Sequence, residues 1–304
     1  MGVKLNKRGN IMEDLKYWIW LSRIEGLTPK EKIELLDKFK NPNIIYNKTK
    51  DELIENGIKE KKAEIITKNE YKKNLDKYIE YMQKNNIEII TIKDKFYPKR
   101  LKEIYDPPIT LYLKGNKNIL NNITIAIIGC RLCTSYGRSI STNISYNLSL
   151  NNINIISGLA MGIDTYAHIG CLNAKGKTIG VMGCGLDRVY PKENEKIFDR
   201  IIKTGGAVIS EYVIGTKPLA KNFPKRNRII SGMSNGILVV EAKEKSGTLI
   251  TVDFALEQGK EIYVVPGNIN SMNSYGTNEL IKQGAKVVTK VEDILEDLGK
   301  LQQE

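Results

Sequence analysis

The sequence predicts an α/β protein with a mainly parallel sheet over residues 86–304, preceded by a small all-helical domain over residues 1–85. Three observations lead to this fold class. Short β-branched runs alternate with helix-length segments after residue 122, which is typical of a parallel sheet buried on both faces. Helix-capping signals dominate before residue 86. Glycine-containing loops follow the carboxyl ends of successive strands, where open α/β sheets bind ligands.

The first 85 residues are expected to form short helices. Thr28–Glu31 is a capping box with proline at the first helical position, and Thr49–Glu52 repeats the pattern. Gly57 is placed to end the second of these helices, and a longer helix is predicted over Glu60–Lys84. Such an arrangement suits a sterile-alpha-motif or helix-hairpin-helix module that contacts DNA or a protein. A plain helical cap on the next domain remains the alternative.

The sheet is predicted from apolar, β-branched runs. Pro107 and Pro108 should keep the second strand away from the sheet centre. The last helix is expected over Val291–Gly299. The predicted strands are Ile87–Ile92, Ile109–Leu113, Ile123–Ile128, Ile153–Ile156, Thr178–Met182, Ala207–Ile209, Ile237–Val240, Ile262–Val265 and Val287–Thr289.

Composition narrows the class of protein. The formal net charge is +12, which favours a polyanionic partner, although a codon bias towards Lys, Asn and Ile would give the same excess. No apolar run approaches the roughly 20 residues of a membrane span, and four cysteines do not indicate a secreted disulfide framework. We therefore expect a cytoplasmic protein without membrane contact. Because Gly2–Asn10 shows no periodicity, translation could start at Met1 or at Met12.

Candidate binding residues gather in the loops that follow the predicted strands. Glycines there let backbone amides approach a ligand, and the helix N-termini that follow favour anions. These loops therefore predict a phosphate-binding shelf. Its candidate residues are Gly129, Arg131, Ser157, Gly158, Gly162, Ser246, Gly247 and Thr248.

Two common phosphate motifs are missing from this shelf. Gly129 is followed by Cys130-Arg131, so the dinucleotide fingerprint G-x-G-x-x-G is absent after the first strand of the alternating region. There is also no G-x-x-x-x-G-K-[ST] loop. These absences argue against an NAD-dependent dehydrogenase and exclude a P-loop ATPase.

The segment Phe223–Ile230 directs the interpretation towards nucleic acid. Arg226 and Arg228 flank Asn227 just after the aromatic Phe223, and all four residues are candidates for DNA binding. Single strands are held by bases that stack on aromatic rings while arginines engage phosphates. The alternative is that Phe223 belongs to the core and both arginines are surface or structural charges.

The sequence at this point resembles the DNA-processing protein A family (DprA, also called Smf). The resemblance extends over about Asp94 to Val288. It is carried by Ser157–Asp164 with Ala167-His168, Gly183–Asp187 with Tyr190-Pro191, Ser210-Glu211, Phe223–Ile230, Val240–Ala242, Ser246–Thr251, Pro266-Gly267, and Gly276–Ile281 with Gly284-Ala285.

The resemblance implies an extended Rossmann-like domain that binds single-stranded DNA. Because the sequence shows no nucleophile–base pair, metal set or cofactor loop, we expect a protein that is not an enzyme and uses no cofactor or metal. Such proteins protect incoming DNA, load the RecA recombinase during natural transformation and typically form homodimers through this domain. Arg131, Lys177 and Phe223 with its basic neighbours, Lys221 included, match pocket positions of the family. Two positions depart from the pattern. Met161 replaces a usual arginine, which could weaken a phosphate contact, and Cys130 stands where Ser or Thr is common.

The sequence does not complete an enzymatic site. His168 is the only histidine, and Asp164 lies one helical turn before it, but no nucleophile or metal cluster completes a site. The structural alternative is that the Asp164 carboxylate accepts hydrogen bonds from loop amides or from His168. Cys130 and Cys133 form a C-x-x-C without a second knuckle, which makes zinc or redox function the weaker reading. A Rossmann-like enzyme that processes a nucleotide or a nucleoside monophosphate remains the alternative function.

Overall fold

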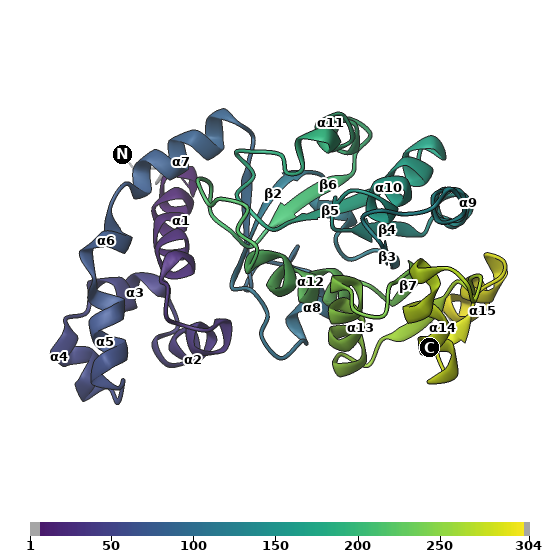
Figure 1. Ribbon diagram of the computed structural model, residues 1–304. Coiled ribbons are helices and arrows are strands. Elements are labelled where there is room, and N and C mark those ends of the chain that lie inside the picture. Colours follow the sequence, from purple (N-terminus) through teal and green to yellow (C-terminus); the bar gives the residue numbers. More distant parts are fainter. Residues whose placement is uncertain (1–6, 301–304) are drawn as a thin grey trace.

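The computed structural model describes residues 7–300, which form a helical segment followed by an α/β unit (Figure 1). The helical segment contains α1 (Lys7–Arg23), α2 (Pro29–Phe39), α3 (Pro42–Asn47), α4 (Lys50–Glu55), α5 (Glu60–Thr67), α6 (Asn69–Lys72) and α7 (Leu75–Lys84). Both predicted capping boxes are formed, at Thr28 with Glu31 and at Thr49 with Glu52. None of the helices within residues 7–300 is both long and apolar enough to cross a bilayer.

The single helix predicted over Glu60–Lys84 is wrong, because the chain forms α5, α6 and α7 there. Asn74 adopts a left-handed conformation with φ of 61°, which interrupts the helical path. Asparagine tolerates that region better than most residues. The question of Met1 as the start falls outside the described residues.

The sheet confirms the predicted fold class. Its strands are β1 (Glu88–Thr91), β2 (Thr110–Gly115), β3 (Thr124–Gly129), β4 (Asn154–Ser157), β5 (Thr178–Met182), β6 (Ala207–Ser210), β7 (Gly236–Glu241), β8 (Glu261–Val264) and β9 (Lys286–Val287). They lie in the order β1-β2-β6-β5-β4-β3-β7-β8-β9. The pairs β1–β2 and β2–β6 are antiparallel, and all others are parallel. As Pro107 and Pro108 suggested, β2 is not central.

The strand order reverses at β3. The chain runs outward through β4, β5 and β6 and then crosses to β7 on the other side of β3. A crevice opens at such a switch point because the loops after the neighbouring strands diverge. The register between β3 and β7 also shifts at Ile128 and Gly129, where the loop begins.

Helices cover both faces of the sheet (Figure 1). Apolar side chains of α9 (Ser135–Leu150), α10 (Ile163–Asn173) and α15 (Glu292–Lys300) pack in one buried cluster with β3, β4 and β7. Side chains of α8 (Lys99–Lys102), α12 (Asn222–Met233) and α13 (Gly247–Glu257) pack in another. Two further helices, α11 (Glu195–Lys203) and α14 (Tyr275–Lys282), complete the α/β unit.

The N-terminal helices pack against β2 and its neighbours. Trp20 and Leu36 share one apolar cluster with Tyr112 of β2, whose hydroxyl lies 3.0 Å from Ser22 Oγ. Lys32 is buried at this contact and donates to Ser22 O at 2.7 Å, and burial lowers its pKa to about 8. Because the apolar cluster is continuous here, the division into domains 1–85 and 86–304 stays a prediction, as does the likeness to a sterile-alpha-motif or helix-hairpin-helix module.

Candidate functional site

A cavity of about 660 Å³ opens at the switch point. The loops after β3, β4 and β7 and the helices α12 and α13 form its walls. It brings together many of the residues predicted from sequence. These are Gly129, Arg131, Phe223, Arg226, Asn227, Ser246, Gly247 and Thr248.

The loops after β3 and β4 interlock at the base of the cavity. Gly162 has a φ of +78°, and a Cβ there would lie 2.2 Å from Cys130 O. Ile163 N donates to the same carbonyl at 3.2 Å. Gly162 therefore allows the two loops to approach closely, and it does not itself line the cavity.

Phe223 is half-buried in the cavity wall. A Cβ on Gly183 would come within 2.9 Å of Phe223 Cδ1, so the ring packs closely on that glycine. The Tyr190 ring lies beside it, with the centroids 5.5 Å apart. The guanidinium carbon of the exposed Arg131 lies over the Phe223 ring, 5.7 Å from its centroid. Phe223 thus combines a core contact with an accessible part in the cavity, and Arg131 is placed as expected.

Arg226 lies beneath the cavity and is 4% exposed. Its Nη2 donates to Gly158 O at 3.0 Å, and a Cβ on Gly158 would lie 1.8 Å from Nη1. Burial lowers the pKa of Arg226 to about 10, so the side chain stays charged at neutral pH. Its Nε is buried and has no hydrogen-bond partner within residues 7–300. A buried donor without a partner is costly, and an acceptor atom of a ligand would satisfy it.

Asp164 serves the loop after β4. Its Oδ2 accepts hydrogen bonds from Gly158 N at 3.0 Å and from Ala160 N at 3.3 Å. Burial raises the pKa of Asp164, while the charge of Arg226 and the two amides act in the opposite direction. The expected hydrogen bonds between loop amides and this carboxylate are confirmed.

His168 bonds to a neighbouring strand. Its Nδ1 lies 2.7 Å from Thr178 Oγ1, and that hydroxyl gives its hydrogen to Ile155 O. Nδ1 must therefore donate, which leaves Nε2 as an acceptor. Nε2 is buried and has no partner in the described part of the chain. Burial lowers the pKa of His168 to about 3, so the ring is neutral at pH 7.

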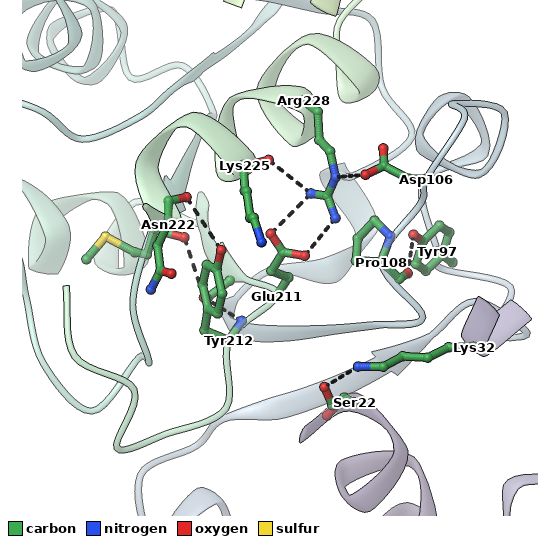
Figure 2. A network of polar contacts seen from close by, with 12 residues as sticks. Ser22, Lys32, Tyr97, Asp106, Pro108, Glu211, Tyr212, Asn222, Lys225 and Arg228 are labelled. Carbon is green, nitrogen blue, oxygen red and sulfur yellow. Dashed lines mark hydrogen bonds and ion pairs between the residues drawn. The ribbon is translucent and has the colours of Figure 1, made fainter. Parts of the chain in front are cut away.

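Arg228 differs from the expectation that both arginines face the ligand (Figure 2). Its Nε donates to Asp106 Oδ2 at 2.9 Å, and its Nη1 and Nη2 donate to the two Glu211 oxygens at 3.1 and 2.7 Å. Burial opposes the charge, but Glu211 and Asp106 more than offset this and raise the pKa of Arg228. Residues two apart on a helix point about 200° apart, so Arg226 and Arg228 cannot share a face. Arg228 therefore has a structural role, as the cation of an ion pair with Glu211 and Asp106.

Ser157 and Gly158 support the site from within the sheet. Ser157 is buried, and its Oγ donates to Ile127 O at 2.7 Å. Gly158 provides the space and the carbonyl that Arg226 needs. Neither residue lines the cavity.

Two lysines lie outside the cavity. Lys177 precedes β5, at the amino end of a strand whose carboxyl end faces the site. Its Nζ donates to Thr204 O at 2.5 Å. A strand of this length separates Lys177 from the cavity edge by roughly 16 Å, so the structure does not bring it to this pocket. Lys221 is exposed at the start of α12 but does not line the cavity.

The cavity also contains residues that the sequence reasoning missed. Lys243 is exposed and lines it, as do Tyr190 and Leu132. The position of Lys243, two residues after β7, was the available signal.

Ser246, which the sequence predicted, precedes α13. It occupies the N-cap position without a side-chain hydrogen bond to the helix, and its Oγ is buried and unpartnered in the described structure. A helix N-terminus with a free hydroxyl favours an anionic group.

The two departures from the family pattern occupy different settings. Cys130 is buried and lines the cavity, and burial raises its pKa as it does that of Cys133. Met161 is exposed and does not line the cavity. Among the side chains of residues 14–299, no three His, Cys, Asp or Glu are grouped so that they could hold a metal ion.

Comparisons with known proteins give a consistent result. Residues 88–299 match the family described as DNA recombination-mediator protein A. The DNA processing protein DprA of Bacillus subtilis is 43% identical over 217 residues, which cover 71% of this chain and 73% of the relative. The X-ray structure of DprA from Streptococcus pneumoniae superposes with a TM-score of 0.80 at 36% identity, covering 92% of this chain and 97% of that one.

A second solved structure bears on the ligand. DNA processing protein A from Helicobacter pylori, described for its single-stranded-DNA binding mode, superposes with a TM-score of 0.63 at 31% identity. The superposition covers 70% of this chain and 96% of that one.

Proposed function

The chain belongs to the DNA recombination-mediator protein A family, and we propose that it binds single-stranded DNA in the cavity between the loops after β3 and β7 and the helices α12 and α13. The observation that carries the proposal is the half-buried Phe223 ring in the cavity wall, with the Arg131 guanidinium over it. An accessible ring beside a free guanidinium holds a base and its phosphate without reading the sequence.

Unsatisfied donors in the same cavity support an anionic ligand. Arg226 Nε and Ser246 Oγ are both buried and unpartnered in the described structure, and both residues line the cavity. Exposed Lys243 and Arg131 add positive charge at the surface. Phosphate oxygens are acceptors with negative charge, so one backbone segment would satisfy several of these groups at once.

The wider role is proposed from the family. We infer that the chain protects incoming single strands and loads the RecA recombinase on them during natural transformation, acting as a homodimer through its α/β domain. The family description as a recombination mediator supports this role. If it is correct, the protein should raise RecA-dependent strand exchange on single strands coated with a competing binding protein, and Phe223→Ala should lose that effect.

We propose no enzymatic activity. Asp164 holds the loop after β4 through two amides, and His168 is committed to Thr178 and neutral. Asp164 lines the cavity, so it is the carboxylate that the alternative, a nucleotide-processing enzyme, would use as a base. Turnover of a nucleoside monophosphate that survives repurification and disappears in Asp164→Asn would favour that alternative.

A titration with fluorescent oligonucleotides, single-stranded against duplex, tests the binding proposal. Phe223→Ala should weaken single-strand binding by ~1–3 kcal/mol, the usual value of one stacked base. The exposed Tyr146 on α9, outside the cavity, provides a matched control, and Tyr146→Ala should bind normally. If Phe223→Ala folds normally and keeps both its affinity and its preference, the ring belongs to the core alone.

A further inference from the structure

Asn227 has an amide with no structural task in the described chain. It lies on α12 one helical turn after Phe223, lines the cavity and is half-buried. Its side chain makes no hydrogen bond to any of residues 14–299. Side chains four residues apart on a helix are neighbours, with Cβ atoms roughly 6 Å apart. A free amide therefore stands beside the proposed stacking ring.

Another asparagine on the same helix shows the contrast. Asn222 is buried, and its Nδ2 donates to Gly183 O at 3.1 Å, which fixes the start of α12 to the loop after β5. Asparagine is a poor helix former, so one inside a helix without a contact lowers stability slightly. Asn227 has that cost and no internal compensation, which points to a contact made with a ligand.

We propose that Asn227 hydrogen-bonds to the Watson–Crick edge of the base that stacks on Phe223, an inference that rests on the single-strand binding proposed above. An amide offers one acceptor and one donor side by side. Each of the four bases presents a donor next to an acceptor on its Watson–Crick edge: N6–H and N1 in adenine, N4–H and N3 in cytosine, N1–H and O6 in guanine, and N3–H and O4 in thymine. Rotation of the amide by a half-turn matches either order.

The consequence is selection for single strands without selection for sequence. In a duplex every Watson–Crick edge is already paired, so Asn227 finds no partner there, whereas splayed bases of a single strand offer theirs. Stacking on Phe223 requires a base with a free face, and the hydrogen bonds to Asn227 require a base with a free Watson–Crick edge.

The substitution Asn227→Asp tests this reading because a carboxylate offers two acceptors and no donor. Only guanine presents two adjacent donors, N1–H and N2–H, on that edge. We expect wild-type protein to bind short oligo-dT strands carrying a central G, A, C or T within about threefold of one another. Asn227→Asp should prefer the guanine strand over the all-thymine strand by about tenfold, the discrimination of one bidentate contact. Asn227→Leu should lose affinity equally for all four strands and narrow the gap between single strand and duplex.

Asn118→Asp is the matched control for charge. Asn118 is exposed on the short helix η1 (Lys117–Ile119), which follows β2. The end of β2 pairs with the first residue of β6, so Asn118 lies at the sheet edge away from the cavity. This variant should show no base preference.

The outcomes separate the two proposals. If wild-type protein fails to bind single strands, the proposed function is wrong. If wild-type protein binds, and Asn227→Asp folds with a native circular-dichroism spectrum but weakens all four strands equally, Asn227 contacts no base edge and the inference is overturned.

Discussion

The buried His168 makes a quantitative prediction about stability in acid. Burial and the nearby charge of Arg226 lower the pKa of this ring from 6.5 to about 3. In the unfolded chain the ring takes up a proton as the pH falls through 6.5, while in the folded protein it does not until about pH 3. The unfolded state therefore binds more protons in this window, and the free energy of unfolding falls as the pH falls.

The size of the effect follows from the two pKa values. A pH of 5 lies about 1.5 units below the pKa of the ring in the unfolded chain, and each unit changes the free energy of unfolding by about 1.4 kcal/mol. Wild-type protein should lose about 2 kcal/mol between pH 8 and pH 5 through His168 alone. The raised pKa of Asp164 acts in the opposite direction, since the folded carboxyl binds a proton more readily there. The histidine contribution must therefore be isolated by a variant.

His168→Gln provides that variant, because its amide can still donate to Thr178 Oγ1 and does not titrate. Urea unfolding followed by circular dichroism at pH 8 and at pH 5 gives the free energy for both proteins. The wild-type loss should exceed the variant loss by about 2 kcal/mol. Equal losses would show that His168 is protonated in the folded state or accessible to water, and the assignment of a neutral, buried ring would be wrong.

Three further predictions concern buried charges and the DNA contact. Burial lowers the pKa of Lys32 from 10.5 to about 8, so the folded state releases this proton at a lower pH than the unfolded state. The free energy of unfolding of the wild-type protein should therefore rise from pH 8 towards pH 10 relative to that of Lys32→Met. If the free energies of the two proteins change in parallel with pH, Lys32 is not a buried ammonium. Glu211→Gln leaves Arg228 with only the partly exposed Asp106 as a charged partner and should destabilise the protein by about 3 kcal/mol in the same urea assay, whereas a change under 1 kcal/mol would mean that the pair is not buried. Arg131→Ala should weaken single-strand binding by ~1–3 kcal/mol and flatten its dependence on log salt by about one unit, and an unchanged salt slope would remove Arg131 from the phosphate contact.

The sequence predicted the sheet well for a physical reason. A strand buried on both faces is mostly apolar, so runs such as Ile179–Met182 leave a continuous signal in the sequence. The switch-point cavity followed from the same strands, because the carboxyl ends of parallel strands meet at one edge. Arg131 follows β3 directly and could be placed in this way, whereas Phe223 was predicted from its own segment and from the family resemblance.

Side-chain partners could not be predicted in the same way. Arg228 pairs with Asp106 and Glu211, and Asp106 lies more than a hundred positions away from it in the sequence. No local sequence pattern predicts such a pair. Lys177 lies away from this cavity for another reason: a residue before a parallel strand lies at the opposite end of the strand from the residues that follow it, and only the family resemblance suggested a pocket position for Lys177.

The two arginines around Asn227 explain why this residue can be held without contacts of its own. Arg226 ties α12 to the loop after β4 through Gly158 O, and Arg228 ties the opposite side of the helix to Glu211 and Asp106. A helix anchored on both sides holds the groups between its anchors in fixed directions, and preorganised groups lose less entropy on binding. We infer that the buried charges support the proposed DNA binding indirectly, because they hold Asn227, which lies between them on α12, in a fixed direction at the cavity. On this argument Glu211→Gln should weaken single-strand binding although Glu211 does not line the cavity, and the loss should persist at temperatures well below unfolding.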